Sequence, residues 1–164
     1  FRQFFPVFAV PFYVRCAGTS RCSEMKALSY YDALPDTMTA QDLRHEFSSI
    51  IDNVPIQRKK RHECLQALWA LGDRQWHTYT ALEEPLKTQV DTFLIACWDG
   101  FDLACVELVI SISAGLGLQG THDFILSRKA DEVSFEVAEA IKDAIAELGT
   151  DVSDPYSDMR LSAQ

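Results

Sequence analysis

Cys97, Cys105 and His122 are the residues that could supply a cysteine nucleophile and its base. A thiol becomes nucleophilic when a neighbouring base or positive charge lowers its pKa. Both cysteines instead stand among apolar residues at helical spacing, where burial raises the pKa of a thiol and makes it inert. We therefore expect core packing here and no enzymatic activity.

His62-Glu63-Cys64 contains three residue types that bind metals. Consecutive residues on a helix point in different directions, and no second ligand follows three or four residues away. We expect an exposed His62 beside a buried Cys64, with no metal and no cofactor.

The five cysteines are an odd number and include no C-x-x-C pair. A disulfide framework is therefore not expected, and a reduced, cytoplasmic setting fits better. They are Cys16, Cys22, Cys64, Cys97 and Cys105.

The run Arg58–Arg61 places four basic residues in the N-terminal half of an expected helix, where the helix dipole disfavours cations. A nucleic-acid or phosphate patch is one interpretation. In so acidic a chain, internal salt-bridge partners or a solvated face are the preferred interpretation.

The formal net charge of the 164 residues is −9. Residues 1–24 carry +2, so residues 25–164 carry −11. This balance disfavours nucleic acid and anionic membrane as partners and favours a basic protein.

Acidic residues concentrate in the last third of the chain, where Glu132, Glu136, Glu139 and Asp143 recur at the spacing of one helix face. A solvated face is one interpretation, and a docking surface for a basic protein is the other. Trp76 and Tyr79 are candidate aromatic anchors. The candidate partner-binding residues are Glu132, Glu136, Glu139, Asp143, Glu147, Asp151, Asp154, Trp76 and Tyr79.

Helices must position these groups, because apolar residues recur at helical spacing along most of the chain and no stretch is typical of a strand. Thr39, Asp102 and Ser134 are expected N-caps, and Thr80–Glu83 has the form of a capping box. Apolar residues surround the stretch from Leu103 to Leu118, which predicts a buried central helix. The expected helices cover 39–54, 55–72, 80–97, 103–118, a short segment from Thr121, and 134–149.

Three Leu-Gly pairs, ending at Gly72, Gly117 and Gly149, are interpreted as helix ends. Their spacing suits helix pairs of about 40 residues. The predicted fold is therefore all-α, with stacked antiparallel helix pairs in a short HEAT-like α-solenoid. A plain helical bundle is the alternative.

Residues 1–24 are expected to be an N-terminal extension outside the core, with Met25 opening a single all-α domain over residues 25–164. The apolar run Phe4–Val14 has about the length of a signal-peptide core, so a truncated signal peptide is the alternative.

Four motifs carry a family resemblance: Cys97–Leu103 (CWDGFDL), Ile110–Leu118 (ISISAGLGL), Glu147–Gly149 (ELG) and Asp154–Ser157 (DPYS). Through these motifs, residues 38–158 resemble the small all-α immunity proteins of bacterial polymorphic-toxin and contact-dependent inhibition systems. Such proteins often have Ser-Glu-Asp or similar in the turn where this chain has Asp99–Asp102, so only the capping role carries over.

The resemblance implies a protein that binds and neutralises one cognate toxin in the cytoplasm, with neither a reaction nor a cofactor. Many such toxins are nucleases with basic clefts, which an acidic surface can occupy. The alternative function is a HEAT-like scaffold or adaptor for protein–protein interaction without a toxin partner.

Overall fold

A computed structural model describes residues 25–52 and 57–157. Within them the chain forms helices and no strands, which confirms the predicted all-α fold. The expected extension at 1–24 and the expected helix boundary at Val54 and Pro55 lie outside the described residues. The helices are α1 (Leu28–Asp32), α2 (Ala40–Ile51), α3 (Arg58–Trp76), α4 (Leu86–Cys97), α5 (Leu103–Leu116), α6 (Gln119–Leu126) and α7 (Phe135–Leu148).

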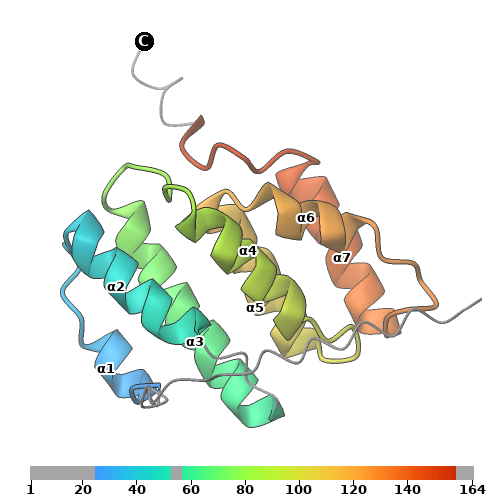
Figure 1. Ribbon diagram of the computed structural model, residues 1–164. Coiled ribbons are helices and arrows are strands. Elements are labelled where there is room, and N and C mark those ends of the chain that lie inside the picture. The colour runs from blue at the N-terminus through green and yellow to red at the C-terminus, as the bar shows by residue number, and fades with distance from the viewer. Residues whose placement is uncertain (1–24, 53–56, 158–164) are drawn as a thin grey trace, which may run out of the picture.

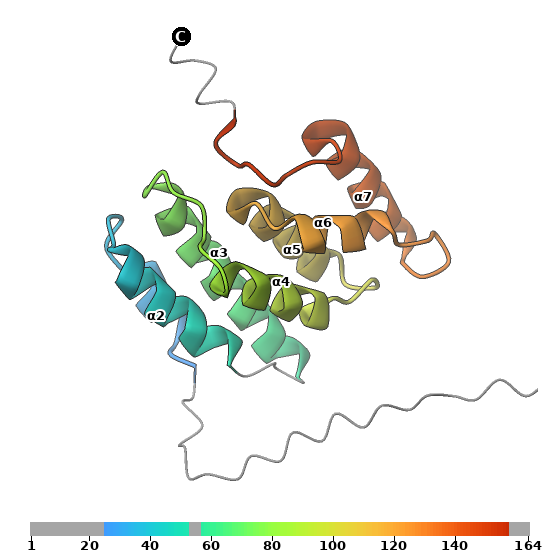
Figure 2. The same ribbon diagram turned by 45° about the horizontal axis from the view of Figure 1, so that its top comes forward.

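The helices stack in two layers (Figures 1 and 2). One layer contains α2, α4 and α6, and the other contains α3, α5 and α7, each helix contacting the next in its layer. The short α1 packs on α3. Contacts of α2 with α3, and of α6 with α5 and α7, join the layers.

Neighbouring helices within a layer run parallel, as stacked antiparallel pairs require. Arg58 and Asp102 meet at the N-terminal ends of α3 and α5, whereas Gly72 approaches Leu116 near their C-terminal ends. The chain runs in one direction in the first layer and returns in the second (Figure 1). The order of the helices is therefore that of three stacked pairs: α2/α3, α4/α5 and α6/α7.

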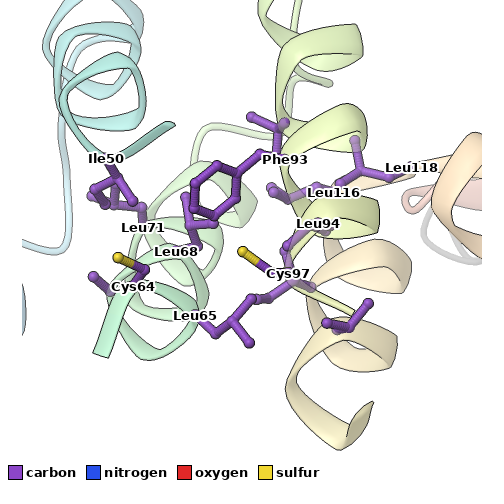
Figure 3. Close-up of a cluster of buried hydrophobic side chains, with 14 of the residues drawn as sticks. Ile50, Cys64, Leu65, Leu68, Leu71, Phe93, Leu94, Cys97, Leu116 and Leu118 are labelled. Atoms are coloured by element: carbon purple, nitrogen blue, oxygen red, sulfur yellow. The ribbon is translucent and has the colours of Figure 1, made fainter. Parts of the chain in front are cut away.

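The hydrophobic core lies between the layers (Figure 3). Leucines along α3 meet Phe93 and Leu94 of α4 and Leu116 at the end of α5. Each fully buried side chain of this size stabilises the fold by roughly 1.5–3 kcal/mol relative to its exposed state. The α3 leucines are Leu65, Leu68 and Leu71, all 0% exposed.

The three predicted N-caps are confirmed. The side chains of Thr39, Asp102 and Ser134 accept hydrogen bonds from backbone N–H groups in the first turns of α2, α5 and α7. Gly117 ends α5 in the left-handed conformation (φ 68°), and Gly149 ends α7. The sequence patterns thus locate these helix ends correctly.

The prediction that Gly72 ends a helix is wrong, because α3 continues to Trp76. Arg74 holds the last turn in place by donating hydrogen bonds to the backbone oxygens of Ala70, Asp32 and Leu34. Gly72 instead faces the side chain of Leu116, where α3 and α5 pass each other closely.

The prediction of a capping box at Thr80–Glu83 is also wrong, because α4 begins only at Leu86. The carbonyl oxygen of Thr80 accepts hydrogen bonds from the Gln75 side chain and the Tyr156 hydroxyl, at 2.7 and 3.1 Å. These tertiary contacts hold the segment as a loop. Glu84 serves the helix instead, because its side chain accepts a hydrogen bond from the backbone N–H of Thr88.

The helix expected from Thr121 begins earlier, at Gln119, and Thr121 is buried inside it. The carboxylate of Asp91 in α4 accepts a hydrogen bond from the Thr121 backbone N–H, at 2.6 Å. It therefore satisfies one of the free N–H groups in the first turn of α6. A Cβ at Gly120 would lie 2.6 Å from the same carboxylate, which explains the glycine.

The central helix α5 is not buried all round. It buries Val106, Val109 and Ile112, while Leu103 and Glu107 are exposed. Trp69 of α3 is 54% exposed, although its neighbour Leu68 is fully buried. The outer surface of the α3–α5 layer is therefore partly apolar, a property that periodicity alone does not reveal.

Candidate partner-binding surfaces

The first candidate surface is the outward side of α7. Val137 and Ile141 face the core, and Glu136 and Asp143 are exposed to solvent. Residues 131–157 contain eight acidic residues and one basic residue, Lys142, so this part of the chain carries a net charge of −7. The predicted acidic face of the last helix is present.

Glu132 does not belong to that helix face, because it lies in the loop before α7. Its carboxylate accepts a hydrogen bond from the Lys129 backbone N–H and lies 3.7 Å from Arg128. The regular spacing of acidic residues from Glu132 to Asp143 predicted that Glu132 lies on the helix. This prediction is wrong, because α7 begins only after its N-cap, Ser134.

Of the remaining carboxylates on α7, one forms an ion pair with a neighbouring lysine and the others form none with a described residue. The Glu139 carboxylate lies 2.5 Å from Lys142 Nζ, one turn away. Glu136, Asp143 and Glu147 make no ion pair within residues 25–52 and 57–157. We call these three residues, with Phe135, the α7 acidic surface.

Asp151 and Asp154, predicted as binding residues in the tail, also shape the tail itself. The Asp151 carboxylate accepts hydrogen bonds from the backbone N–H and the hydroxyl of Ser153. The Asp154 carboxylate accepts one from the backbone N–H of Tyr156. These local turns direct the tail across the ends of the helices toward α3 (Figure 2).

Tyr156 fastens the tail to the first helix pair. Its ring stacks on Trp76 with centroids 4.8 Å apart, and its hydroxyl lies 3.2 Å from the Gln75 carbonyl oxygen and 3.1 Å from that of Thr80. One face of Trp76 is therefore covered by the protein's own tail. Tyr79 stays 69% exposed, in the loop that follows α3.

The structure does not unite the two parts of the predicted site. Helix α5 lies between α3, which bears Trp76, and α7, which bears the carboxylates. Trp76 and Tyr79 therefore belong to a different part of the surface from Glu136 and Asp143.

Two exposed aromatic residues lie in the same part of the fold as the α7 carboxylates, and the charge and spacing patterns did not indicate them. Phe135, the first residue of α7, is 75% exposed, and Phe101, in the turn before α5, is 70% exposed. A hydrogen bond from Ser134 N–H to the Gly100 oxygen, 2.9 Å long, brings their two segments together. The helical spacing of Phe135, opposite Val137 and Ile141, could have indicated its exposure.

The basic run contacts two carboxylates in the turn before α5. Arg58 Nε and His62 Nε2 each lie 2.7 Å from Asp102 Oδ2, and Arg61 lies 3.1 Å from Asp99. Asp102 is only 4% exposed, and the Arg58 guanidinium, helped by His62, lowers the pKa of its carboxyl group to about 2. The expectation of internal salt-bridge partners is confirmed for Arg58 and Arg61.

Three cysteines are buried free thiols, as expected. Burial raises the pKa of Cys97 to about 12, and those of Cys64 and Cys105 to about 11. Cys105 donates a hydrogen bond to the Cys97 carbonyl oxygen, and the His122 ring nitrogen Nε2 contacts the Gly149 carbonyl oxygen instead of a thiol. In the described part of the chain, these groups form no nucleophile–base pair.

His62 is bound to Asp102 rather than fully exposed as expected, and Cys64 is buried. Across residues 25–52 and 57–157, no three His, Cys, Asp or Glu side chains are grouped to hold a metal ion. Nor does any helix there combine the length and apolar character needed to cross a bilayer.

Comparison with known proteins gives no match: no family model fits the chain, and no curated protein or solved structure is similar to it.

Proposed function

We propose that the protein is an immunity protein that binds and neutralises a cognate toxin in the cytoplasm, with the α7 acidic surface as its binding site. The observation that carries the proposal is an exposed aromatic side chain on a helix rich in carboxylates. Phe135 is 75% exposed, its neighbour Glu136 is also exposed, and Asp143 and Glu147 are exposed farther along α7. The resemblance of residues 38–158 to immunity proteins supports the same function.

A basic toxin cleft and this surface complement each other in charge. Complementary potentials accelerate association and orient the two partners, while like charges exclude wrong ones. A nuclease cleft that binds phosphates would accept a line of carboxylates in their place. The toxin is therefore expected to be a basic domain, such as a nuclease.

An exposed aromatic side chain supplies binding energy that charges alone do not. Interfaces derive most of their affinity from a few buried anchors, often aromatic, surrounded by polar contacts. Phe135 fits this role, because its ring is exposed and the carboxylate of Glu136 follows it directly in the chain. Phe101, on the neighbouring turn, is the second candidate anchor.

Co-expression tests the proposal. The proposal predicts that a toxin domain is encoded beside this protein, and that cells producing this domain survive when they also produce the full chain and die when they do not. Death in both cases, with the chain present in soluble form, would contradict the immunity function and favour the helical adaptor.

A further inference from the structure

Trp69 marks a second surface, remote from α7. It lies midway along α3, where the neighbouring core residue Leu68 is fully buried, yet 54% of its own surface is exposed. Burial of a tryptophan side chain is among the largest single contributions to binding at an interface. The exposed Trp69 in the middle of α3 is therefore a candidate binding residue.

Trp69 stands between two hollows in the outer surface of the α3–α5 layer. One hollow, of about 320 Å³, is lined by α1, α3 and Leu108 of α5. The other, of about 290 Å³, extends to Trp76 and is floored by Gly72 and Gly115. Trp69 lines both hollows, which we together call the Trp69 groove.

The length of the groove matches a short helix. Its lining on α3 extends from Gln66 to Trp76, which corresponds to about 15 Å of helix at 1.5 Å per residue. A partner helix of about three turns covers that distance. Its apolar side chains at i and i+4 or i+7 would enter the hollows on either side of Trp69.

The charges that line the groove are all negative. Asp32 lines one hollow and Asp73 lines the other, both are exposed, and in the described part of the chain neither lysine nor arginine lines either hollow. The Arg74 guanidinium lies beside this region but donates to the backbone oxygens of Asp32 and Leu34, and the His77 ring lies 3.9 Å from the Asp73 carboxylate. A groove that combines apolar lining residues with two exposed carboxylates is complementary to an amphipathic helix flanked by Lys or Arg.

We propose that the Trp69 groove binds a basic amphipathic helix of about three turns from a partner protein. The helix places its apolar face on Trp69 and its basic side chains near Asp32 and Asp73. This inference does not depend on the function proposed for α7, because none of the described residues that line the Trp69 groove belongs to α7.

Gly115 provides a way to close the groove without disturbing the fold. It lies in α5 and contributes to the floor of one hollow, and a Cβ added there would meet no atom within 4 Å. Gly115→Leu therefore fills the hollow from a helical position that tolerates a side chain. Ala96→Leu, at an exposed position of α4 in the other layer, is the matched control.

The probes are three synthetic helical peptides of about 14 residues. The first has a leucine face flanked by lysines, the second replaces each lysine with glutamate, and the third replaces each leucine with glutamine. Binding to the full chain is followed through the indole N–H signals of its tryptophans in ¹H–¹⁵N spectra, with Trp69→Phe used to assign the Trp69 signal.

The first peptide is expected to shift the Trp69 and Trp76 signals to saturation and to leave that of Trp98 in place. The glutamate and glutamine peptides are expected to bind at least tenfold more weakly. Gly115→Leu is expected to weaken binding of the first peptide at least tenfold, and Ala96→Leu is expected to leave it unchanged. Trp69→Ala gives the same test should Gly115→Leu fail to fold.

Three results would overturn the proposal. Equal binding of the lysine and glutamate peptides would remove the role of charge. Unchanged binding by a folded Gly115→Leu protein would place the site elsewhere. Tighter binding of a peptide of residues 1–24, or a Trp69 shift on concentrating the protein alone, would assign the groove to the chain itself or to a second copy.

Discussion

Arg58 Nε lies 2.7 Å from Asp102 Oδ2, although 44 positions separate the two residues in the sequence. Asp102 is also the N-cap of α5, where its other carboxylate oxygen accepts a hydrogen bond from Cys105 N–H. One nearly buried side chain thus begins the central helix and joins it to the start of α3. This pair, with His62, fixes the register between the first and second helix pairs.

Asp102→Asn is expected to lower the free energy of unfolding by roughly 2 kcal/mol or more, because Arg58 and His62 lose the charge that they surround while Asn still caps the helix. Urea unfolding at pH 7 measures the loss. Asp99→Asn is the matched control, because Asp99 is a more exposed partner of Arg61 and its pair is worth less. Equal stability of wild type and Asp102→Asn would contradict this role.

The stabilisation by Asp102 is expected to vanish in acid. Its carboxyl pKa is about 2 in the folded protein, against an ordinary value of 3.8, so the folded state favours the ionised form. The contribution, about 2 kcal/mol, is fully present above about pH 4 and is lost as the pH falls toward 2. Unfolding curves of the two proteins should therefore converge between pH 4 and pH 2, and a constant difference over that range would exclude this cause.

Two glycines only two positions apart are expected to respond oppositely to alanine. Gly117 has φ 68°, and a Cβ there would lie 2.8 Å from Pro155 Cδ and 2.9 Å from the Ser153 oxygen. Gly117→Ala should therefore destabilise the protein by more than about 1 kcal/mol. Gly115→Ala should stabilise it by about 0.5–1 kcal/mol, since Gly115 is helical and open. Thermal unfolding compares them, and destabilisation of similar size in both would contradict the geometry.

Tyr156 is expected to contribute to stability through both its ring and its hydroxyl. Tyr156→Phe keeps the stack on Trp76 and loses the hydrogen bond, at a cost of about 1 kcal/mol. Tyr156→Ala removes both and should cost roughly 3 kcal/mol or more. Tyr79→Phe, at a 69% exposed position, is the control and should change little. Thermal unfolding is expected to show the largest loss of stability for Tyr156→Ala, a smaller loss for Tyr156→Phe and almost none for Tyr79→Phe. A different order would contradict this role of the tail.

The buried cysteines are expected to resist alkylation. Because their pKa values are about 11 to 12, few thiolates exist at pH 8, and the core shields them from reagents. Peptide mass spectrometry after iodoacetamide should find Cys64, Cys97 and Cys105 unmodified in the native protein and modified in urea. Rapid labelling of Cys105 in the native protein would contradict this expectation and indicate a reactive thiol.

The sequence predicted the fold class and most helix ends, because caps and apolar periodicity are local signals. Thr39, Asp102 and Ser134 each cap a helix with their own side chain, and Gly117 ends one by its own conformation. Gly72 was misjudged because its conformation depends on tertiary contacts. Helix α3 continues past Gly72 because Arg74 donates hydrogen bonds to distant backbone oxygens. Two of these oxygens belong to Asp32 and Leu34, about 40 residues away in the sequence.

The candidate surface was predicted in part. Charge and spacing located Glu136, Glu139 and Asp143 on the outward face of α7. Composition could not distinguish an exposed aromatic side chain from one that packs inside the protein. Trp76 stacks on Tyr156, whereas Phe135 and Trp69 are exposed. That difference depends on which distant segments cover each ring.

Charge reversal on α7 tests the proposed function most directly. The measurement is the survival of cells that co-express the toxin domain predicted to be encoded beside this protein with each of two double variants. Glu136→Lys with Asp143→Lys changes the α7 acidic surface. Asp36→Lys with Asp52→Lys produces the same change in net charge at exposed positions near α2. The first variant, shown to be folded, is expected to lose protection while the second protects like the wild type. Protection by both, or its loss in both, would contradict a binding site on α7.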